Sequence, residues 1–367
     1  MIPIIEFVLG IAVLVYCAEK LIGQLVGVAS RWAISLFLIA VVFTGIEFDD
    51  LAFGVVLNVE GLQQVALGTV IGTTIAMTGI VLALAAIIAP CRVDVPRDYL
   101  VLFVAAPVVM FALALTGVLT LLTGVVLVVL FVAFVGWIGY REYSSRRPVF
   151  RNAELYEQLE KVGAGGTATM TATGGGDTPA AGPGGPTGSG GFDLPTDLRI
   201  DQGFLKARRR SRWGGLGLAV LALAGLVVGA FVAARGTDGI LDTFEIAGTV
   251  FGVTIATLAL SLEDIFLTVE PARRGAPEIG VANVIGSVVF SVTGKLGIVL
   301  LVGGVITVGD DVLSWHLPVM LAMTALSAIF LATGRLRRWH GIVLLALYIA
   351  YFVISLVVFG EVPLDSD

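Results

Sequence analysis

Two stretches of the sequence place several carboxylates within otherwise apolar segments. The stretch from 45 to 77 contains Glu47, Asp49 and Asp50, and the stretch from 259 to 291 contains Glu263 and Asp264. Ionised side chains are expensive inside a bilayer, and acids that occur there mark ion or proton pathways. Because such a cluster occurs twice, the sequence predicts a cation-transport site to which both stretches contribute.

Both stretches continue with small and hydroxyl-bearing residues at matching distances. The same number of residues separates Asp50 from Thr69 as separates Asp264 from Asn283. Hard cations such as Ca²⁺ take roughly six to eight oxygen ligands, many of them carboxylates and carbonyls. Two opposed carboxylates with flanking hydroxyls, here Thr73 and Ser287, are suited to that chemistry. The same groups can hold Na⁺ or H⁺ in an alternate state, as an antiporter requires.

The composition places these stretches in a membrane. Of the 367 residues, 57% are apolar and 14% are charged, and the mean hydropathy is +0.99. A soluble domain carries about 25% charged residues. The N-terminus has no basic region or cleavage site, so we expect an uncleaved first helix. No Walker, nucleophile-elbow or zinc motif is present, and we expect neither an enzyme nor a cofactor.

Ten apolar segments are long enough to cross a bilayer, which takes about 20 helical residues. We predict an all-α integral membrane protein with ten helices, at 4–27, 33–59, 65–89, 99–116, 118–140, 214–234, 244–269, 279–308, 312–333 and 340–359. One membrane half covers 1–140 and the other covers 214–367. The connecting segment, 141–213, includes a run rich in Gly, Thr and Pro that predicts a largely disordered linker.

The basic residues predict the orientation of the helices. They gather in alternate connections, namely Arg31, Arg92, Arg97, the central loop, Arg273, Arg274, Arg335, Arg337 and Arg338, whereas the other connections and the termini hold only Arg235. The positive-inside rule then makes the linker cytoplasmic and puts both termini outside, in a multi-pass protein of the cell membrane. With five helices each, the halves have opposite orientations, which is the inverted-repeat architecture. The basic run before the sixth helix, 206–212, indicates contact with lipid headgroups and not with nucleic acid.

Helix length predicts the depth of the acids. Asp50 and Asp264 each precede a polar boundary by about 15 Å of helix, which is half of a roughly 30 Å apolar layer. Asp50, Asp264, Thr73 and Ser287 should therefore converge near the midplane from opposite faces. The second helix is too long to cross without a tilt or a break near Gly45 and Asp49–Asp50. Glycines at 68, 72 and 286 would let the helices approach closely.

Lys295 also falls inside an apolar segment, beyond Ser287. We expect it to pair with Glu263, Asp264, Glu47 or Asp49. It can act as a fixed internal counter-ion that replaces a transported Na⁺ or H⁺, or as one partner of a static salt bridge, and the sequence favours neither. His316 and His340 fall near the ends of predicted helices, where we expect interfacial residues.

In these motifs the chain resembles the alpha repeats of the sodium/calcium exchanger family, within the cation/calcium antiporter superfamily. The family's repeat reads G-T-S-[LA]-P-E and, further along, G-N-x-x-G-S-N-[IL]-F-N. The second repeat, about 252–294, matches at Ser261, Leu262, Asn283, Gly286, Ser287 and Phe290, with Asp264 at the Glu position. The first, about 38–80, matches at Gly45, Gly68, Gly72, Thr73 and Ile75, with Asp50 at the Glu position.

The resemblance implies a function for these positions. Asp50 and Asp264 would be the central Ca²⁺ ligands, with oxygens from Thr73, Ser261, Ser287 and Ser291 around them. The chain departs from the family where the Pro of each repeat is Asp49 or Glu263, and where further polar positions are Ile46, Glu47, Met77 and Leu260. Hydroxyls that hold Na⁺ are thus lost and acids are gained, which favours proton coupling more than the family pattern does.

The resulting expectation is an antiporter that exchanges Ca²⁺ against Na⁺ or H⁺ by alternating access, with membrane lipids and the transported cations as its partners. Two alternatives stay open. One is an exchanger of the same fold that moves another cation against protons. The other is a transport-inactive sensor or scaffold, in which Lys295 neutralises the former site. The oligomeric state is not predicted.

Overall fold

The computed structural model describes residues 2–29, 46–93, 95–144, 212–273 and 277–359, and these form helices with two short strand pairs. The segments labelled η below are π-helical turns within or at the start of longer helices. The first half comprises α1 (Ile2–Ala29), α3 (Phe48–Val59), α4 (Gln63–Ala76), η1 (Met77–Val81), α5 (Leu82–Ile88), β1 (Cys91–Arg92), α6 (Arg97–Ala114), β2 (Val118–Leu119) and α7 (Leu121–Ser144).

The second half follows a similar order of elements. It comprises α10 (Arg212–Phe244), α11 (Gly248–Phe251), η3 (Gly252–Ala256), α12 (Thr257–Leu260), α13 (Leu262–Arg273), α14 (Pro277–Val289), η4 (Phe290–Lys295), α15 (Leu296–Gly303), β3 (Ile306–Thr307), η5 (Val312–His316), α16 (Leu317–Ala332), β4 (Arg335–Leu336) and α17 (Arg338–Val358). Most of the predicted linker lies outside the described residues, although α7 and α10 reach into its two ends.

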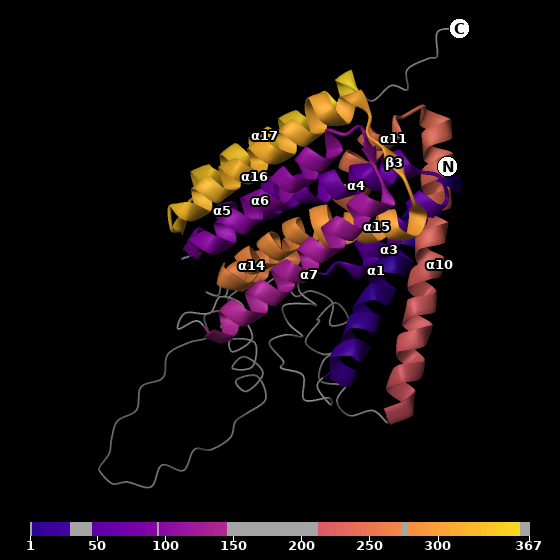
Figure 1. Ribbon diagram of the computed structural model, residues 1–367, viewed down its shortest axis with the longest axis horizontal. Helices are drawn as coiled ribbons and strands as arrows, with labels where there is room; N and C mark the ends of the chain where they lie inside the picture. Colours follow the sequence, from indigo (N-terminus) through magenta and orange to yellow (C-terminus); the bar gives the residue numbers. More distant parts are fainter. Residues whose placement is uncertain (1, 30–45, 94, 145–211, 274–276, 360–367) are drawn as a thin grey trace, which may run out of the picture.

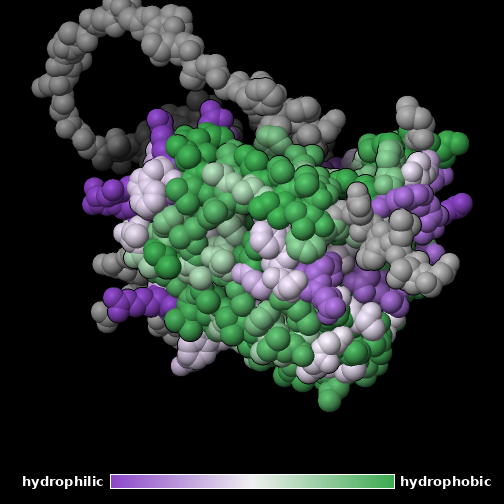
Figure 2. Space-filling view, turned by 90° about the horizontal axis from the view of Figure 1, so that it is seen from above, coloured by the Kyte–Doolittle hydropathy of each residue, from purple (hydrophilic) through white to green (hydrophobic). Residues whose placement is uncertain are grey.

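The helices fit a protein that crosses a membrane several times. Among the described residues, eight helices are long and apolar enough to span a bilayer, and nine if a pair bent by 48° at Ser261 counts as one span. The second predicted helix, 33–59, is not among these spans, because it is described only from residue 46 onward. Large apolar side chains are exposed along the outer helices, and apolar residues cover most of the face in Figure 2. Such a surface suits contact with lipid.

Two helices have boundaries that glycine or non-helical residues set. The helix expected at 279–308 ends at Gly303, because Gly304 has a φ of +89° and the chain then enters β3. Near Asp49–Asp50, where the sequence predicts a tilt or a break, Ile46 and Glu47 are not helical and α3 begins at Phe48, whereas the earlier part of the predicted helix lies outside the described residues. In the second half the matching helix breaks at Ser261, directly before α13.

The two helices that carry the small-residue motifs form the centre of the bundle. The span Gln63–Ile88 is 78% buried and Gly280–Gly303 is 89% buried, whereas no other continuous span among the described residues exceeds 44%. α1 and α10 pack side by side along one edge, and their lower ends extend beyond the other helices in Figure 1. Beside this centre, Asp49 and Asp50 at the start of α3 and Asp264 at the start of α13 are buried within the protein.

Close contact at the centre depends on glycines, as predicted for two of them. A Cβ atom at Gly68 would lie 2.5 Å from the carbonyl oxygen of Thr249, on α11. A Cβ atom at Gly72 would overlap the Thr257 hydroxyl, on α12. Only glycine permits this approach, so α4 contacts the broken helix of the other half almost backbone to backbone.

The described elements recur along the chain with one constant offset. The step in residue number from the start of α3 to the start of α13 equals the step between the ends of these two helices. The start of α14 follows the start of α4 by the same step. A π-helical turn follows both α4 and α14, as η1 and η4. The duplication seen in the acidic motifs therefore extends to the backbone of the helices that carry them.

The short strands join one half to the other. β1 pairs antiparallel with β4, and β2 pairs antiparallel with β3. In each pair, a strand that follows the motif-bearing helix of one half meets the strand before the last helix of the other half. The two pairings are thus the same arrangement with the halves exchanged.

Equivalent turns precede β2 and β4. The Thr116 hydroxyl donates to the carbonyls of Leu113 and Val118, and the Thr333 hydroxyl donates to those of Phe330 and Arg335. The next residue in each turn is a glycine with positive φ, Gly117 at 76° and Gly334 at 69°. The Thr-Gly pair is a local signal of the repeat that lies outside the acidic motifs.

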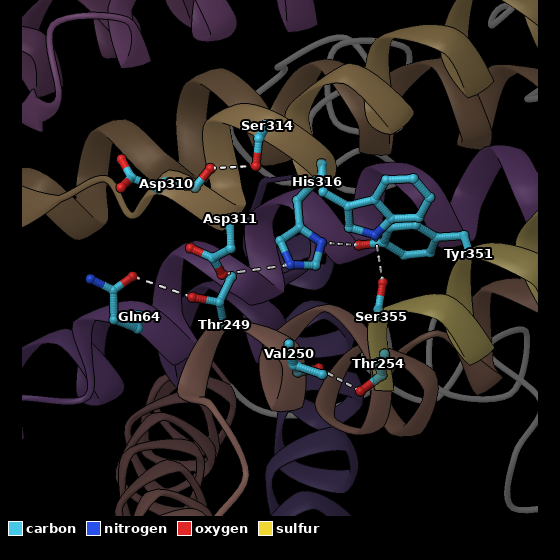
Figure 3. A network of polar contacts seen from close by, with 11 residues as sticks. Gln64, Thr249, Val250, Thr254, Asp310, Asp311, Ser314, His316, Tyr351 and Ser355 are labelled. Carbon is cyan, nitrogen blue, oxygen red and sulfur yellow. Dashed lines mark hydrogen bonds and ion pairs between the residues drawn. The ribbon is translucent and has the colours of Figure 1, made fainter. Parts of the chain in front are cut away.

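A polar network ties α17 to the segment at the start of α16 (Figure 3). The His316 ring contacts the Tyr351 hydroxyl at 2.8 Å and the Asp311 carboxylate at 3.8 Å, and Trp315 donates to Ser355. His316 is fully buried, and His340 is buried and stacks on Phe330. Both histidines thus lie near helix ends, as predicted, and their rings are buried against neighbouring helices.

Candidate functional site

Asp50 lies in the first turn of α3 and Asp264 in the first turn of α13. Each is preceded by a second acid, Asp49 or Glu263. The N-terminal end of a helix carries a partial positive charge, which favours carboxylates in its first turn. Because both helices begin in mid-segment, the chain presents two buried helix N-termini with their acids to the centre of the bundle.

The Asp50 carboxylate is buried and has two unlike oxygens. Oδ2 accepts a hydrogen bond from the Thr73 hydroxyl at 2.9 Å and also lies 2.6 Å from the Lys295 ammonium. Oδ1 is buried without a hydrogen-bond partner. The predicted contact between Asp50 and Thr73 is therefore present, and one oxygen of Asp50 remains available.

Lys295 is fully buried and pairs with Asp50. This corrects the expected pairing with Glu263, Asp264, Glu47 or Asp49. Lys295 is the last residue of η4, and its side chain runs past Gly54 of α3, where a Cβ atom would lie 3.2 Å from the lysine Cε. The lack of a side chain at Gly54 leaves room for the lysine stem on the face of α3 that carries Asp50, one turn earlier.

Asp264 has a different environment from Asp50. The Asn283 amide donates to Asp264 Oδ1 at 3.5 Å and to the Thr268 hydroxyl at 3.4 Å. Asp264 forms no ion pair with any residue that the structure describes. Asn283 is thus a site residue that the sequence-based set omitted, although its place in the Asn-x-x-Gly-Ser motif was the signal.

The acids of the two halves come together. The charge of Asp264 interacts with those of Glu47 and Asp49 as well as with its neighbour Glu263. Glu263 in turn interacts with Asp49 and with Glu19 of α1. The five predicted site acids therefore form one electrostatic cluster, and Lys295 is the one described base that pairs with it directly.

Several oxygens in this region are buried without a hydrogen-bond partner. They are Glu47 Oε1, Asp50 Oδ1, Ser287 Oγ and Ser291 Oγ, of which Glu47 and Ser287 lie close enough to interact with each other. Ser287 and Ser291 are spaced four residues apart on α14 and η4, and Lys295 follows after four more. The two hydroxyls and the ammonium therefore share one face of this helix. Buried polar atoms without partners are rare, and such a group calls for a ligand such as an ion or water.

The acids do not form a preorganised metal centre by themselves. Within the described ranges, no three Asp, Glu, His or Cys side chains are close enough to hold one metal ion together. A cation here would need hydroxyls, backbone carbonyls or water to complete its ligands. Ser261, another predicted ligand, is buried at the break between α12 and α13, where its backbone carbonyl accepts from the Ile265 amide.

Comparison with known proteins identifies a family for this chain. The sequence profile described as sodium/calcium exchanger protein matches residues 2–140 and 214–357. Sodium/calcium exchanger MaX1 of Methanosarcina acetivorans is 26% identical over 353 residues, which cover 94% of this chain and 96% of the relative. Putative antiporter CaxA of Alkalimonas amylolytica is 30% identical over 146 residues, which cover 38% of this chain and 44% of the relative.

A solved structure shares the fold. The sodium-calcium exchanger NCX_Mj superimposes with a TM-score of 0.55 at 20% identity, over 96% of this chain and 98% of the other. The profile match covers both membrane halves, including the acids, the small-residue motifs and Lys295. The chain belongs to the sodium/calcium exchanger family of membrane antiporters.

Proposed function

We propose that this protein exchanges Ca²⁺ against Na⁺ or H⁺ across the cell membrane by alternating access, at a site near the membrane midplane. The observation that carries the proposal is the set of buried oxygens without partners on Glu47, Asp50, Ser287 and Ser291, together with the interaction between the charges of Glu47 and Asp264, which come from different halves. Two carboxylates supply the charge for a divalent cation, and the hydroxyls supply neutral ligands. Membership of an exchanger family supports the same function.

The architecture that supports alternating access is a pair of inverted five-helix repeats, ten helices in all. The constant offset that relates α3 and α4 to α13 and α14 favours it, as do the exchanged strand pairs β1–β4 and β2–β3. In such folds the site lies between the halves, next to broken helices whose N-termini point into it. Rocking of one group of helices against the rest would expose the site to each side in turn.

The first half then extends over 1–140, the second over 214–367, and the linker 141–213 lies in the cytoplasm. Both termini face outward. The alternate placement of basic residues supports this orientation.

The coupling ion of the proposed exchange is Na⁺ or H⁺. Glu47, Asp49 and Glu263 add carboxylates to the two central acids, and closely spaced acids can share protons as the site empties. Proton coupling therefore stands beside sodium coupling, and an exchanger of another cation against protons is the alternative. Flux in proteoliposomes with Na⁺, K⁺, Ca²⁺ and Mn²⁺, each with and without a pH gradient, separates these cases.

Asp264→Asn tests the proposal itself. Asp264 is not ion-paired with a described residue, so the amide should leave the fold intact while removing one of the two central charges. We expect ⁴⁵Ca²⁺ uptake into proteoliposomes to fall to the level of protein-free liposomes. The matched control is Asp242→Asn, at an exposed position on α10, which should retain full uptake. Uptake by Asp264→Asn at the wild-type rate would refute the assignment.

A further inference from the structure

Lys295 is a charged feature of the site that the repeat does not duplicate. At the constant offset that relates α3 to α13, the equivalents of Asp50 and Thr73 are Asp264 and Ser287, both polar, whereas the equivalent of Lys295 is Val81. The equivalent of Gly54, which makes room for the lysine stem, is Thr268. The two halves thus provide similar carboxylates but different partners for them.

The Lys295 ammonium lies where a cation bound to Asp50 would lie. Its Nζ lies 2.6 Å from Asp50 Oδ2, and the Thr73 hydroxyl contacts the same oxygen at 2.9 Å. A small monovalent cation bound to Asp50 on this side would meet the same carboxylate oxygen. The other oxygen, Oδ1, has no partner and belongs to the group that includes Glu47, Ser287 and Ser291. Asp50 can therefore hold the ammonium on one side and a transported cation on the other.

We propose that Lys295 is a tethered replacement for one alkali-metal cation of the exchange cycle, held on Asp50 Oδ2 while the transported ions bind on the Oδ1 side. The inference rests on the proposed exchange function and deepens it. The protein would carry one monovalent cation fewer per cycle than a site with a neutral residue at 295. The chemical reason is charge balance, since an ionised carboxylate is costly to bury without a positive partner, and a covalently attached partner never dissociates.

The test is the Na⁺ dependence of stability in Lys295→Met, a substitution that keeps an unbranched apolar stem and removes the ammonium group with its charge. Purified protein in detergent is heated in choline chloride with increasing NaCl. We expect the apparent unfolding temperature of Lys295→Met to rise with Na⁺ by several degrees more than that of the wild type. The reason is that Na⁺ then binds at the vacated position and stabilises the folded state.

Two further variants make the result specific. Lys295→Met/Asp50→Asn lacks the carboxylate, and its additional Na⁺ dependence should disappear. Lys20→Met removes another lysine of a membrane helix, one that is 42% exposed and bonded to Glu19, and it should respond to Na⁺ as the wild type does. If Lys295→Met is already unfolded in choline chloride, the yield of folded protein after purification in NaCl replaces the unfolding temperature as the readout of Na⁺ binding.

Other outcomes overturn the inference. A Lys295→Met protein that is equally unstable in every salt shows that the bridge is only structural. Recovery by acid pH alone, without dependence on any alkali cation, shows that the lysine does not stand for a metal ion. Because this assay needs no flux, its failure is distinguishable from failure of the proposed exchange, which Asp264→Asn tests.

Discussion

At the scale of single residues, the chemistry centres on the difference between Asp50 and Asp264. Asp50 has a lysine and a hydroxyl on one oxygen, and Asp264 has only the Asn283 amide among the residues described. Removing a charge at the two positions should therefore have different effects on the fold. The two acids of the repeat are equivalent in sequence but not in environment.

Asp50→Asn should destabilise the protein as well as abolish transport. The substitution leaves the Lys295 ammonium buried without a counter-charge, and breaking a buried pair on one side costs about 3–5 kcal/mol. Removing both charges in Asp50→Asn/Lys295→Met should recover most of that loss. Unfolding temperatures of the two single variants and the double variant form a cycle that measures the coupling. Independent, additive effects of the two substitutions would contradict a direct interaction.

The acids could be predicted as a group from the sequence, but the partner of Lys295 could not. Burial of charge in an apolar segment is visible in composition and spacing alone. The direction of Lys295 depends on η4, a π-helical turn that changes the register of the helix between Ser291 and Leu296. Regular helical periodicity contains no signal for such a turn, so the choice among five nearby carboxylates needed coordinates.

At the scale of elements, the close crossing of α4 with α11 and η3 holds the two halves together at the level of the site. Gly68 and Gly252 face each other there, and a Cβ atom on either would lie within 2.5 Å of a carbonyl oxygen of the opposite segment. The backbone cannot yield as a flexible side chain can. The geometry of this crossing therefore sets where the acids of α3 and α13 lie.

Gly68→Ala should destabilise the protein by about 1–3 kcal/mol, as expected when an extra methyl is forced into a well-packed contact. Gly136→Ala is the matched control, because nothing lies within 4 Å of a Cβ atom at that position of α7. The control should be neutral or slightly stabilising, since alanine favours helix more than glycine does. Thermal unfolding in detergent compares the two, and equal stability of both variants would show that the crossing can relax.

The elements themselves were largely accessible from the sequence. Apolar length located every helix that the structure describes within a few residues, apart from the extension of α10 to Phe244. Bilayer thickness predicted a tilt or a break in the segment that contains α3, and α3 begins at Phe48 after two non-helical residues. The Thr-Gly turns before β2 and β4 were missed, because two-residue strands have too little pattern to stand out between helices. Their identical hydrogen bonds became evident only once the backbone was known.

At the scale of the whole molecule, the two strand pairs set the relation between the halves. In each half, the strand that follows the motif-bearing helix pairs with the strand that precedes the last helix of the other half. If the halves have opposite orientations, the two strand pairs must lie on opposite sides of the membrane. The arrangement predicts that a reagent confined to one side of the membrane reaches only one of the two strand pairs. The matched turns at Thr116 and Thr333 allow a test, because the two positions have similar local surroundings.

Thr116→Cys and Thr333→Cys, each in a background with Cys17→Ala and Cys91→Ala, should be labelled from opposite sides. Both threonines are exposed and make equivalent turn contacts, so the intrinsic reactivity of the two thiols should be similar. We expect a membrane-impermeant maleimide to label Thr116→Cys in intact cells and Thr333→Cys only after permeabilisation. Equal labelling of both in detergent-denatured protein is the control for reagent and expression. Labelling of both thiols from the same side would contradict the inverted arrangement. It would also contradict the idea that the acid-bearing helices of the two halves reach one site from opposite faces of the membrane.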